Sequence, residues 1–132
     1  MTDAPIKIER LRKRPDFLAA ARAFSCARGA VVVQARDRAD DTALVRVGFT
    51  ATRKVGGAVV RNRAKRRMRA AAHEVLPGLA RPGFDYVLIA RSGAPARAWP
   101  RLLDDVKSAL ISLATESDRQ ARPSATATPP PA

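Results

Sequence analysis

The sequence contains little that could build a covalent or metal-dependent active site. Its 132 residues include one cysteine, Cys26, and one histidine, His73. A single cysteine excludes an internal disulfide and agrees with a reducing compartment. One cysteine and one histidine are too few for a zinc site and argue against a Cys-His nucleophile. We therefore expect no catalytic residue and no metal site on this chain, and we interpret Cys26 as a small buried residue.

Long apolar runs and aromatic residues are also scarce. No stretch approaches the roughly 18 apolar residues that span a bilayer, and residues 1–14 lack the apolar centre of a signal peptide. The apolar fraction is 46% but only 5% of the residues are aromatic, so the core must consist mainly of Ala, Val and Leu. We expect one domain, located in the cytoplasm. We also expect no membrane contact, because no basic helix carries bulky apolar anchors.

Acidic residues are absent from residues 42–73, although the whole chain has 12 of them against 25 Lys and Arg, a net charge of +13. Within this gap, six of the nine residues 61–69 are cationic. Surface helices usually intersperse acids at helical spacing, which relieves repulsion between cations. A run without such acids is typical of a surface that binds a polyanion, and a nucleic acid is the first expectation.

The same run has the period of an amphipathic helix over residues 58–75. Val60, Ala64, Met68, Ala71 and Val75 form one narrow apolar stripe, while the cations cover most of the remaining circumference. Arg67 lies at the edge of the stripe, so we expect its stem to pack over the sheet rather than to point outward. The sequence Leu-Pro-Gly at residues 76–78 predicts the end of the helix.

The other elements follow from period and turn residues. We expect an α+β fold with the order α-β-β-α-β-α. A basic arm at residues 1–13 precedes a domain at 14–116, and a Pro-rich disordered tail occupies 117–132. Strands at 30–35 and 43–50 are expected to form an antiparallel pair, and the apolar run 84–90 a central strand parallel to 43–50. A first helix would begin at Arg14 and carry Phe17, Ala20, Ala21 and Phe24 on one face, and a last helix would cover 100–115.

Several residues allow two interpretations. The loop 52–57 is either an ordinary turn or, with the helix N-terminus behind it, an anion site, although it is not a P-loop. Asn62 either binds a 2′-hydroxyl or base edge, or holds a neighbouring arginine. Phe17 is more often a core residue than a stacking platform for single-stranded nucleic acid. Asp37, Asp40 and Asp41 share one loop, but solvated loop acids are commoner than magnesium ligands, which disfavours an independent metal nuclease.

Residues 47–69, with the sequence VGFTATRKVGGAVVRNRAKRRMR, resemble the signature of the bacterial ribonuclease P protein component, including its Arg-Asn-Arg helix. The resemblance continues in Arg10-Leu11, in Asp16-Phe17 and in residues 85–91, so that it covers about residues 8–115 in order. It implies a single-domain α/β sandwich similar to a ribosomal protein domain. The sheet would be mixed, and the crossover through the Arg-Asn-Arg helix would be left-handed, against the usual rule.

The resemblance also implies a function. One such protein per RNA would bind ribonuclease P RNA and the 5′ leader of precursor tRNA, while the RNA and the substrate bind the Mg²⁺ ions and the RNA cuts the phosphodiester. The protein alone would be non-catalytic. The residues that match the RNA-facing motif are Arg53, Lys54, Arg61, Asn62, Arg63, Lys65, Arg66 and Arg69, and those assigned to the leader cleft are Phe17, Val31 and Val33.

This chain departs from the family pattern at three positions. Ala21 and Val33 stand where aromatics are frequent, and Gly57 replaces a frequent Asn. Weaker leader contact and the loss of a side-chain cap are therefore expected. The main alternative is a structural rRNA-binding protein of the ribosome, because a basic α/β sandwich suits that role equally well.

Overall fold

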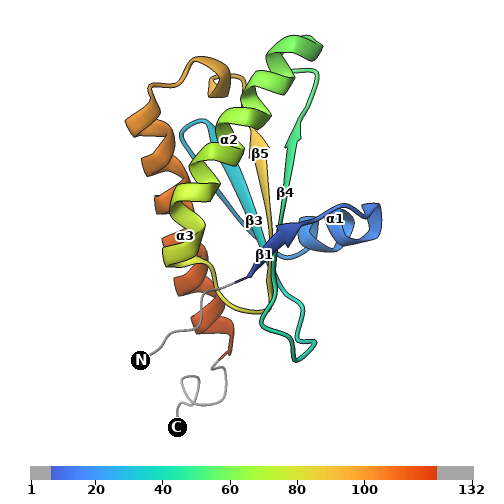
Figure 1. Cartoon of the computed structure of the whole chain (residues 1–132). Helices are drawn as coiled ribbons and strands as arrows, with labels where there is room; N and C mark the ends of the chain where they lie inside the picture. The colour runs from blue at the N-terminus through green and yellow to red at the C-terminus, as the bar shows by residue number, and fades with distance from the viewer. Residues whose placement is uncertain (1–6, 122–132) are drawn as a thin grey trace, which may run out of the picture.

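The computed structural model describes residues 7–121 as one mixed sheet with helices on both faces (Figure 1). Two helices lie on one side of the sheet and the first helix lies on the other side. The strands are β1 (Ile8–Arg10), β2 (Phe24–Arg28), β3 (Val31–Asp37), β4 (Val45–Ala51) and β5 (Phe84–Ala90). The helices are α1 (Arg14–Ala21), α2 (Ala58–Leu79), the short 3₁₀ helix η1 (Ala94–Ala96) and α3 (Trp99–Ala121).

The strand order in the five-stranded sheet is β1-β4-β5-β3-β2. β5 has the predicted bounds and the predicted central place, and it pairs in parallel with β4, to which α2 connects it. The predicted pairing of β3 with β4 is wrong, because β5 lies between them and is antiparallel to β3. β5 is buried on both faces, with Val87 and Leu88 almost inaccessible, and such a strand belongs at the centre of a sheet.

Two short edge strands were not predicted. β1 lies within the expected basic arm, and it pairs in parallel with β4 from Ile8 to Arg10. β2 begins at Phe24, which the sequence pattern placed on the first helix, whereas α1 ends at Ala21. Phe24 instead pairs with Ala35 of β3. Three or five residues at an edge are too few to produce a period that differs clearly from that of a neighbouring helix.

Two helices are longer than predicted. α2 continues through Pro77 to Leu79, because Pro77 lies in the last turn, where one missing N–H costs little, and the N–H of Ala80 still donates to the carbonyl of Leu76 at 2.7 Å. α3 continues to Ala121, so the first residues of the predicted disordered tail are helical. The rest of that tail and the first residues of the predicted arm lie outside the described residues.

The main core lies between the sheet and the pair α2 and α3. Ala, Val and Leu predominate in it, as the composition predicts, with Met68, Leu88 and Leu102 fully buried. A smaller cluster lies on the other face of the sheet, where Leu11, Ala20 and Val87 are buried under α1. α2 is therefore fixed by one side only, which leaves the rest of its surface free for contact with a partner.

Candidate nucleic-acid interface

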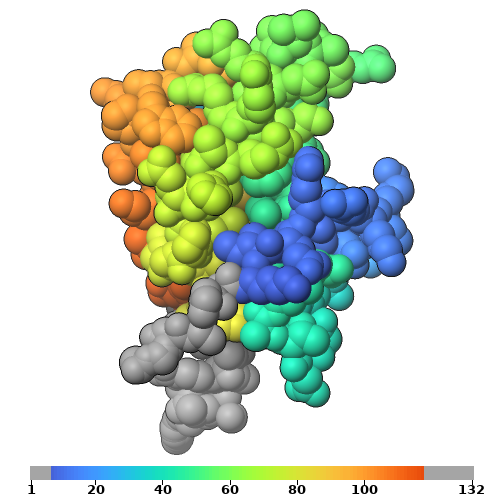
Figure 2. All heavy atoms as spheres, viewed as in Figure 1, coloured from blue at the N-terminus to red at the C-terminus, as the bar shows by residue number. Residues whose placement is uncertain are grey.

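The buried stripe of α2 determines where its charges point. Ala64, Met68, Ala71 and Val75 are buried against the sheet and α3, as predicted. Val60, the first member of the predicted stripe, remains 38% exposed near the helix N-terminus. The cationic residues of 61–69 lie on the parts of the helix circumference outside this stripe, so the fold holds most of them at the surface. Figure 2 shows the green atoms of α2 exposed along the upper front of the molecule.

The exposed cations of α2 and of the preceding loop lie apart from the acidic residues that the structure describes. Arg53, Lys54, Arg63, Arg66 and Arg69 are exposed, and Arg61 and Lys65 are half-buried. In the described part of the chain, none of these seven side chains forms an ion pair. Asn62 is also exposed, and neither of its two predicted roles is decided by its contacts. We call these eight residues the basic face; they match the predicted RNA-facing set.

Arg67 does not belong to the basic face. Its guanidinium donates hydrogen bonds to the carbonyl oxygens of Ala94 at 2.7 Å, Pro95 at 3.2 Å and Arg97. The side chain therefore turns inward rather than outward, as predicted, but it holds η1 against α2 and does not pack over the sheet. One of the six cations in the run thus stabilises the fold and is not available to phosphates.

Two further arginines of α2 are held in place by the fold. The guanidinium of Arg69 lies 5.6 Å from the centre of the Phe49 ring, within the range of a cation–π contact. The Nε atom of Arg61 is buried and has no hydrogen-bond partner among the described residues. An ordered guanidinium with an unpaired N–H loses less conformational entropy when a phosphate binds, and it gains an acceptor.

The loop before α2 adds backbone donors to the basic face. It turns through hydrogen bonds from Val55 N–H to Thr52 and from Gly56 N–H to Arg53, at 3.0 and 3.1 Å. Gly56 has φ of +148°, a conformation that a side chain would strain. Gly57 is the N-cap of α2 and offers no side-chain cap, as predicted from the missing Asn. The first N–H groups of α2 therefore lie beside Arg53 and Lys54 without a side-chain acceptor, which favours an anion there.

The structure places the three residues of the predicted leader cleft on different faces of the sheet, and no observation tests the role of Phe17 itself. Phe17 is half-buried and lies over Gly48 on the α1 side of the sheet. Val31 and Val33 are fully buried on the opposite side, in the main core under α3, so they cannot line a surface with Phe17. Side chains alternate along a strand, and it is Val32 whose side chain lies on the α1 side. The alternation was visible in the sequence, but which face it buries was not.

The sheet surface beside α1 carries arginines whose charge is already compensated. Asp85 is completely buried, and it accepts hydrogen bonds from Arg46 at 2.7 and 2.8 Å and from Arg38 at 2.9 Å. Arg36 lies 3.6 Å from the same carboxylate, and Asp16 pairs with Arg46 at 3.3 Å. The hydrogen bonds that Arg46 donates to the Asp85 carboxylate raise the pKa of Arg46. This cluster stabilises the fold and contributes little net charge toward a ligand.

The described residues offer no magnesium site of their own. Between residues 7 and 121, no three His, Cys, Asp or Glu side chains come together in a way that could hold a metal ion. Two of the three loop acids considered above have partners in their own loop: Asp40 pairs with Arg38, and Asp37 accepts from the N–H of Ala39. None of the helices in the same range has the length and apolar character needed to cross a bilayer.

Comparison with known proteins gives consistent results. The family model described as Ribonuclease P matches residues 6–114. The ribonuclease P protein component of Caulobacter vibrioides (strain NA1000 / CB15N) is 65% identical over 121 residues, which cover 90% of this chain and 81% of the relative. That of Ruegeria pomeroyi is 56% identical over 105 residues, covering 78% of this chain and 84% of the relative.

Solved structures show the same fold. The RNase P protein from Thermotoga maritima aligns with a TM-score of 0.59 and 30% identity, over 79% of this chain and 93% of that one. The Staphylococcus aureus RNase P protein aligns with a TM-score of 0.66 over 79% and 94%, and at 24% identity it supports the fold alone. These relatives are not ribosomal proteins, so the ribosomal alternative is not supported.

Proposed function

Because this chain belongs to the ribonuclease P protein family, we propose that it binds the catalytic RNA of a ribonuclease P holoenzyme and assists removal of the 5′ leader from precursor tRNA. The observation that carries this proposal is the basic face. Seven cations lie on one helix and its loop and form no ion pair with the acidic residues that the structure describes, in a chain whose net charge is +13. RNA phosphates would supply the missing counter-charge.

Arginine predominates in this face, which suits structured RNA. A planar guanidinium can donate two hydrogen bonds to one phosphate and can stack on a base, whereas an ammonium acts as a point charge. Because α2 is fixed along its buried stripe, these guanidinium groups have set spacings of one helical turn. Such a surface favours a folded RNA backbone of matching shape over a flexible polyanion.

The leader of precursor tRNA would lie on the α1 side of the sheet. Phe17, Val32 and Ile89 offer half-buried apolar surface there. The nearby Arg36 and Arg46 are engaged with Asp16 and Asp85, so this surface would contact bases and sugars more than phosphates. Without the aromatic frequent at residue 21 in the family, base stacking would be weak.

In this proposal the chain does not carry out the chemistry. Magnesium ions, which stabilise the charge that develops on the scissile phosphate, would be bound by the RNA subunit and the substrate. The chain would contribute by neutralising phosphates near the junction of the two RNAs, which raises the affinity for the substrate and lowers the magnesium concentration needed. One protein would bind to each RNA subunit, and the complex would act in the cytoplasm.

Reconstitution tests this proposal. Purified protein, ribonuclease P RNA from the same organism and precursor tRNA are combined at low magnesium. We expect cleavage at the mature 5′ end only when the protein and the RNA are both present. Protein alone should leave the substrate intact at any magnesium concentration. Efficient cleavage by RNA-free protein would favour an independent nuclease and contradict the proposal.

A further inference from the structure

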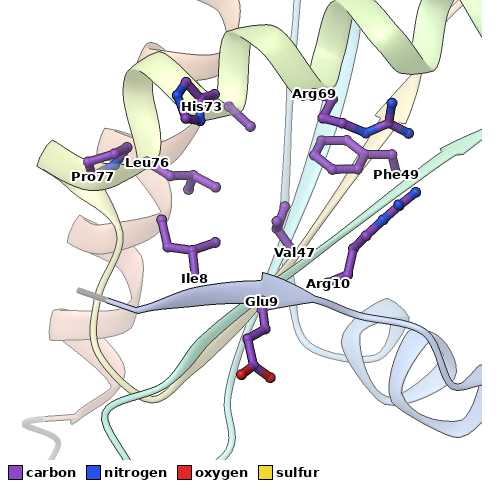
Figure 3. Close-up of a pocket in the computed structure, with 10 residues that line it drawn as sticks. Ile8, Glu9, Arg10, Val47, Phe49, Arg69, His73, Leu76 and Pro77 are labelled. Carbon is purple, nitrogen blue, oxygen red and sulfur yellow. The ribbon is translucent and has the colours of Figure 1, made fainter. Parts of the chain in front are cut away.

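A hollow of about 460 Å³ lies between β1 and the C-terminal half of α2 (Figure 3). Its volume is within the range of about 300 to 1,000 Å³ that is usual for small-ligand sites. It opens beside β1, on the same side of the sheet as the main core. The residues that line it are Ile8, Glu9, Arg10, Val47, Phe49, Arg69, Ala72, His73, Leu76 and Pro77.

The floor of the hollow is apolar and partly aromatic. Val47, Ala72 and Leu76 are buried beneath it, and Ile8 packs beside them from β1. Phe49 forms one wall, with its ring under the guanidinium of Arg69. A flat, uncharged ring system could bury its faces here. A hydrated ion could not bind to this floor, because apolar side chains cannot replace the hydrogen bonds of its hydration shell.

Cations occupy one end of the hollow. Figure 3 shows Arg69 and Arg10 on either side of Phe49, at the same end of the hollow, while Glu9 points away from it. Arg10 is exposed and forms no ion pair in the described part of the chain, whereas Glu9 pairs with Lys7 at 3.5 Å. An apolar cleft with two cations at one end is complementary to a ligand that joins an aromatic ring to an anion.

The opposite end of the hollow carries hydrogen-bonding groups. His73 lies on the rim, and Pro77 removes the N–H that would normally bond to the carbonyl oxygen of His73. That oxygen is thus a candidate acceptor for an amino or hydroxyl group. A ring with polar edges fits this end better than a purely hydrocarbon ligand.

The hollow is continuous with the basic face. Arg61, Lys65 and Arg69 follow one another at intervals of four residues along the side of α2 that faces β4, and Arg69 is also part of the hollow. A nucleic-acid strand that runs along this row would therefore pass the cationic end of the hollow.

We propose that this hollow binds one unpaired nucleotide of the RNA that the basic face holds, with the base against Phe49 and the apolar floor and the phosphate between Arg10 and Arg69. This inference rests on the proposed function. It adds a contact that reads an unstacked base, where the remaining basic face contacts the backbone.

Methyl NMR of the full-length protein tests the proposal with nucleoside 5′-monophosphates as probes. We expect millimolar nucleotide to shift the methyl signals of Ile8, Val47 and Leu76. The nucleoside should shift them less, because it lacks the phosphate, and inorganic phosphate alone should leave them in place. Unmoved methyl signals, or equal shifts with inorganic phosphate, would overturn the proposal. The proposal would also be overturned if these signals moved only with rising protein concentration, because a second copy of the protein would then occupy the hollow.

Two variants separate this site from the basic face. Phe49→Leu removes the aromatic wall and should weaken nucleotide binding about fivefold or more, since stacking contributes about 1 to 3 kcal/mol per base. Arg10→Gln should weaken it about tenfold, while Arg12→Gln, an equal loss of charge on an exposed residue outside the hollow, should leave it unchanged. Thermal unfolding verifies that each variant is folded. Equal effects of the Arg10 and Arg12 variants would contradict the site.

Binding to ribonuclease P RNA distinguishes a failure of the proposed function from a failure of the nucleotide site. If the wild-type protein fails to bind this RNA, the proposed function fails. If it binds the RNA with unchanged affinity after Phe49→Leu, only the nucleotide site fails. We expect a loss of affinity with an unchanged salt dependence in Phe49→Leu, because no phosphate contact is removed.

Discussion

Arg67 donates a hydrogen bond of 2.7 Å to the carbonyl oxygen of Ala94, and this contact separates it from the other cations of α2. The guanidinium holds η1 against the helix through two further carbonyls, those of Pro95 and Arg97. Its neighbour Arg66 is exposed and has no acidic partner between residues 7 and 121. Two adjacent arginines in one cationic run therefore have different tasks, one in the fold and one at the surface.

We predict that Arg67→Ala lowers the free energy of unfolding by about 1.5 to 3 kcal/mol, since it removes hydrogen bonds from a charged group to partly buried carbonyls. Urea denaturation measures this change. Arg66→Ala is the matched control: it should leave stability nearly unchanged and weaken RNA binding. If the two variants lose equal stability, the assignment of Arg67 to the fold is wrong.

Asp85 is the centre of the ion-pair cluster beneath α1. It is completely buried and faces the guanidinium groups of Arg36, Arg38 and Arg46. Asp85→Asn keeps the shape but leaves these cations without their counter-charge, so we expect a loss of about 3 to 5 kcal/mol of stability. Asp41→Asn, in an exposed loop, is the control and should have little effect. Denaturation of both variants gives the comparison, and a neutral Asp85→Asn would refute the structural role of the cluster.

Acid titration probes the pair between Arg38 and Asp40. The hydrogen bond from Arg38 lowers the pKa of Asp40 from 3.8 to about 2. Because the pKa of the folded state is below that of the unfolded state, the pair stabilises the protein above about pH 4. This contribution disappears as the pH falls toward 2. The stability difference between wild type and Asp40→Asn should therefore shrink between pH 4 and pH 2. A difference that stays constant over this interval would rule out the pair as its source.

Gly48 lets α1 approach the sheet. A Cβ atom at this position would lie 2.5 Å from two ring carbons of Phe17, so Gly48→Ala must displace the ring. We expect a loss of about 1 to 3 kcal/mol, typical of overpacking, together with altered NMR signals in α1. Gly78→Ala provides a contrast, because a Cβ atom there meets nothing within 4 Å and alanine favours a helix. Stabilisation by both substitutions would show that Phe17 is not packed on Gly48.

The sequence predicted the elements whose residue patterns are long and regular. β5 has the predicted bounds, and α2 begins at the predicted residue, because a seven-residue segment with six apolar residues between turns and a five-member helical stripe leave few alternatives. The charge of the basic face and the inward position of Arg67 followed from the same period. The contact partners of these arginines, such as Ala94, could not be predicted, because no local pattern indicates which distant residue a long side chain will reach.

The errors have a common physical origin. The pattern of β3 shows that its side chains alternate, but whether Val31 or Val32 faces the main core depends on which side α2 and α3 cover. Similarly, β3 and β4 were predicted as neighbours because they are consecutive. Their separation by β5 depends on the crossover through α2, which is a property of the whole chain.

The central claim is that the unpaired cations of α2 bind ribonuclease P RNA, and filter binding over a series of salt concentrations tests it most directly. For the wild type, log K should fall linearly with log salt, at about −0.7 to −0.9 per phosphate contact. Combining Arg61→Ala with Arg63→Ala should weaken binding about tenfold or more and make the slope less steep by about two contacts. Unchanged affinity and an unchanged slope in this variant would contradict the account.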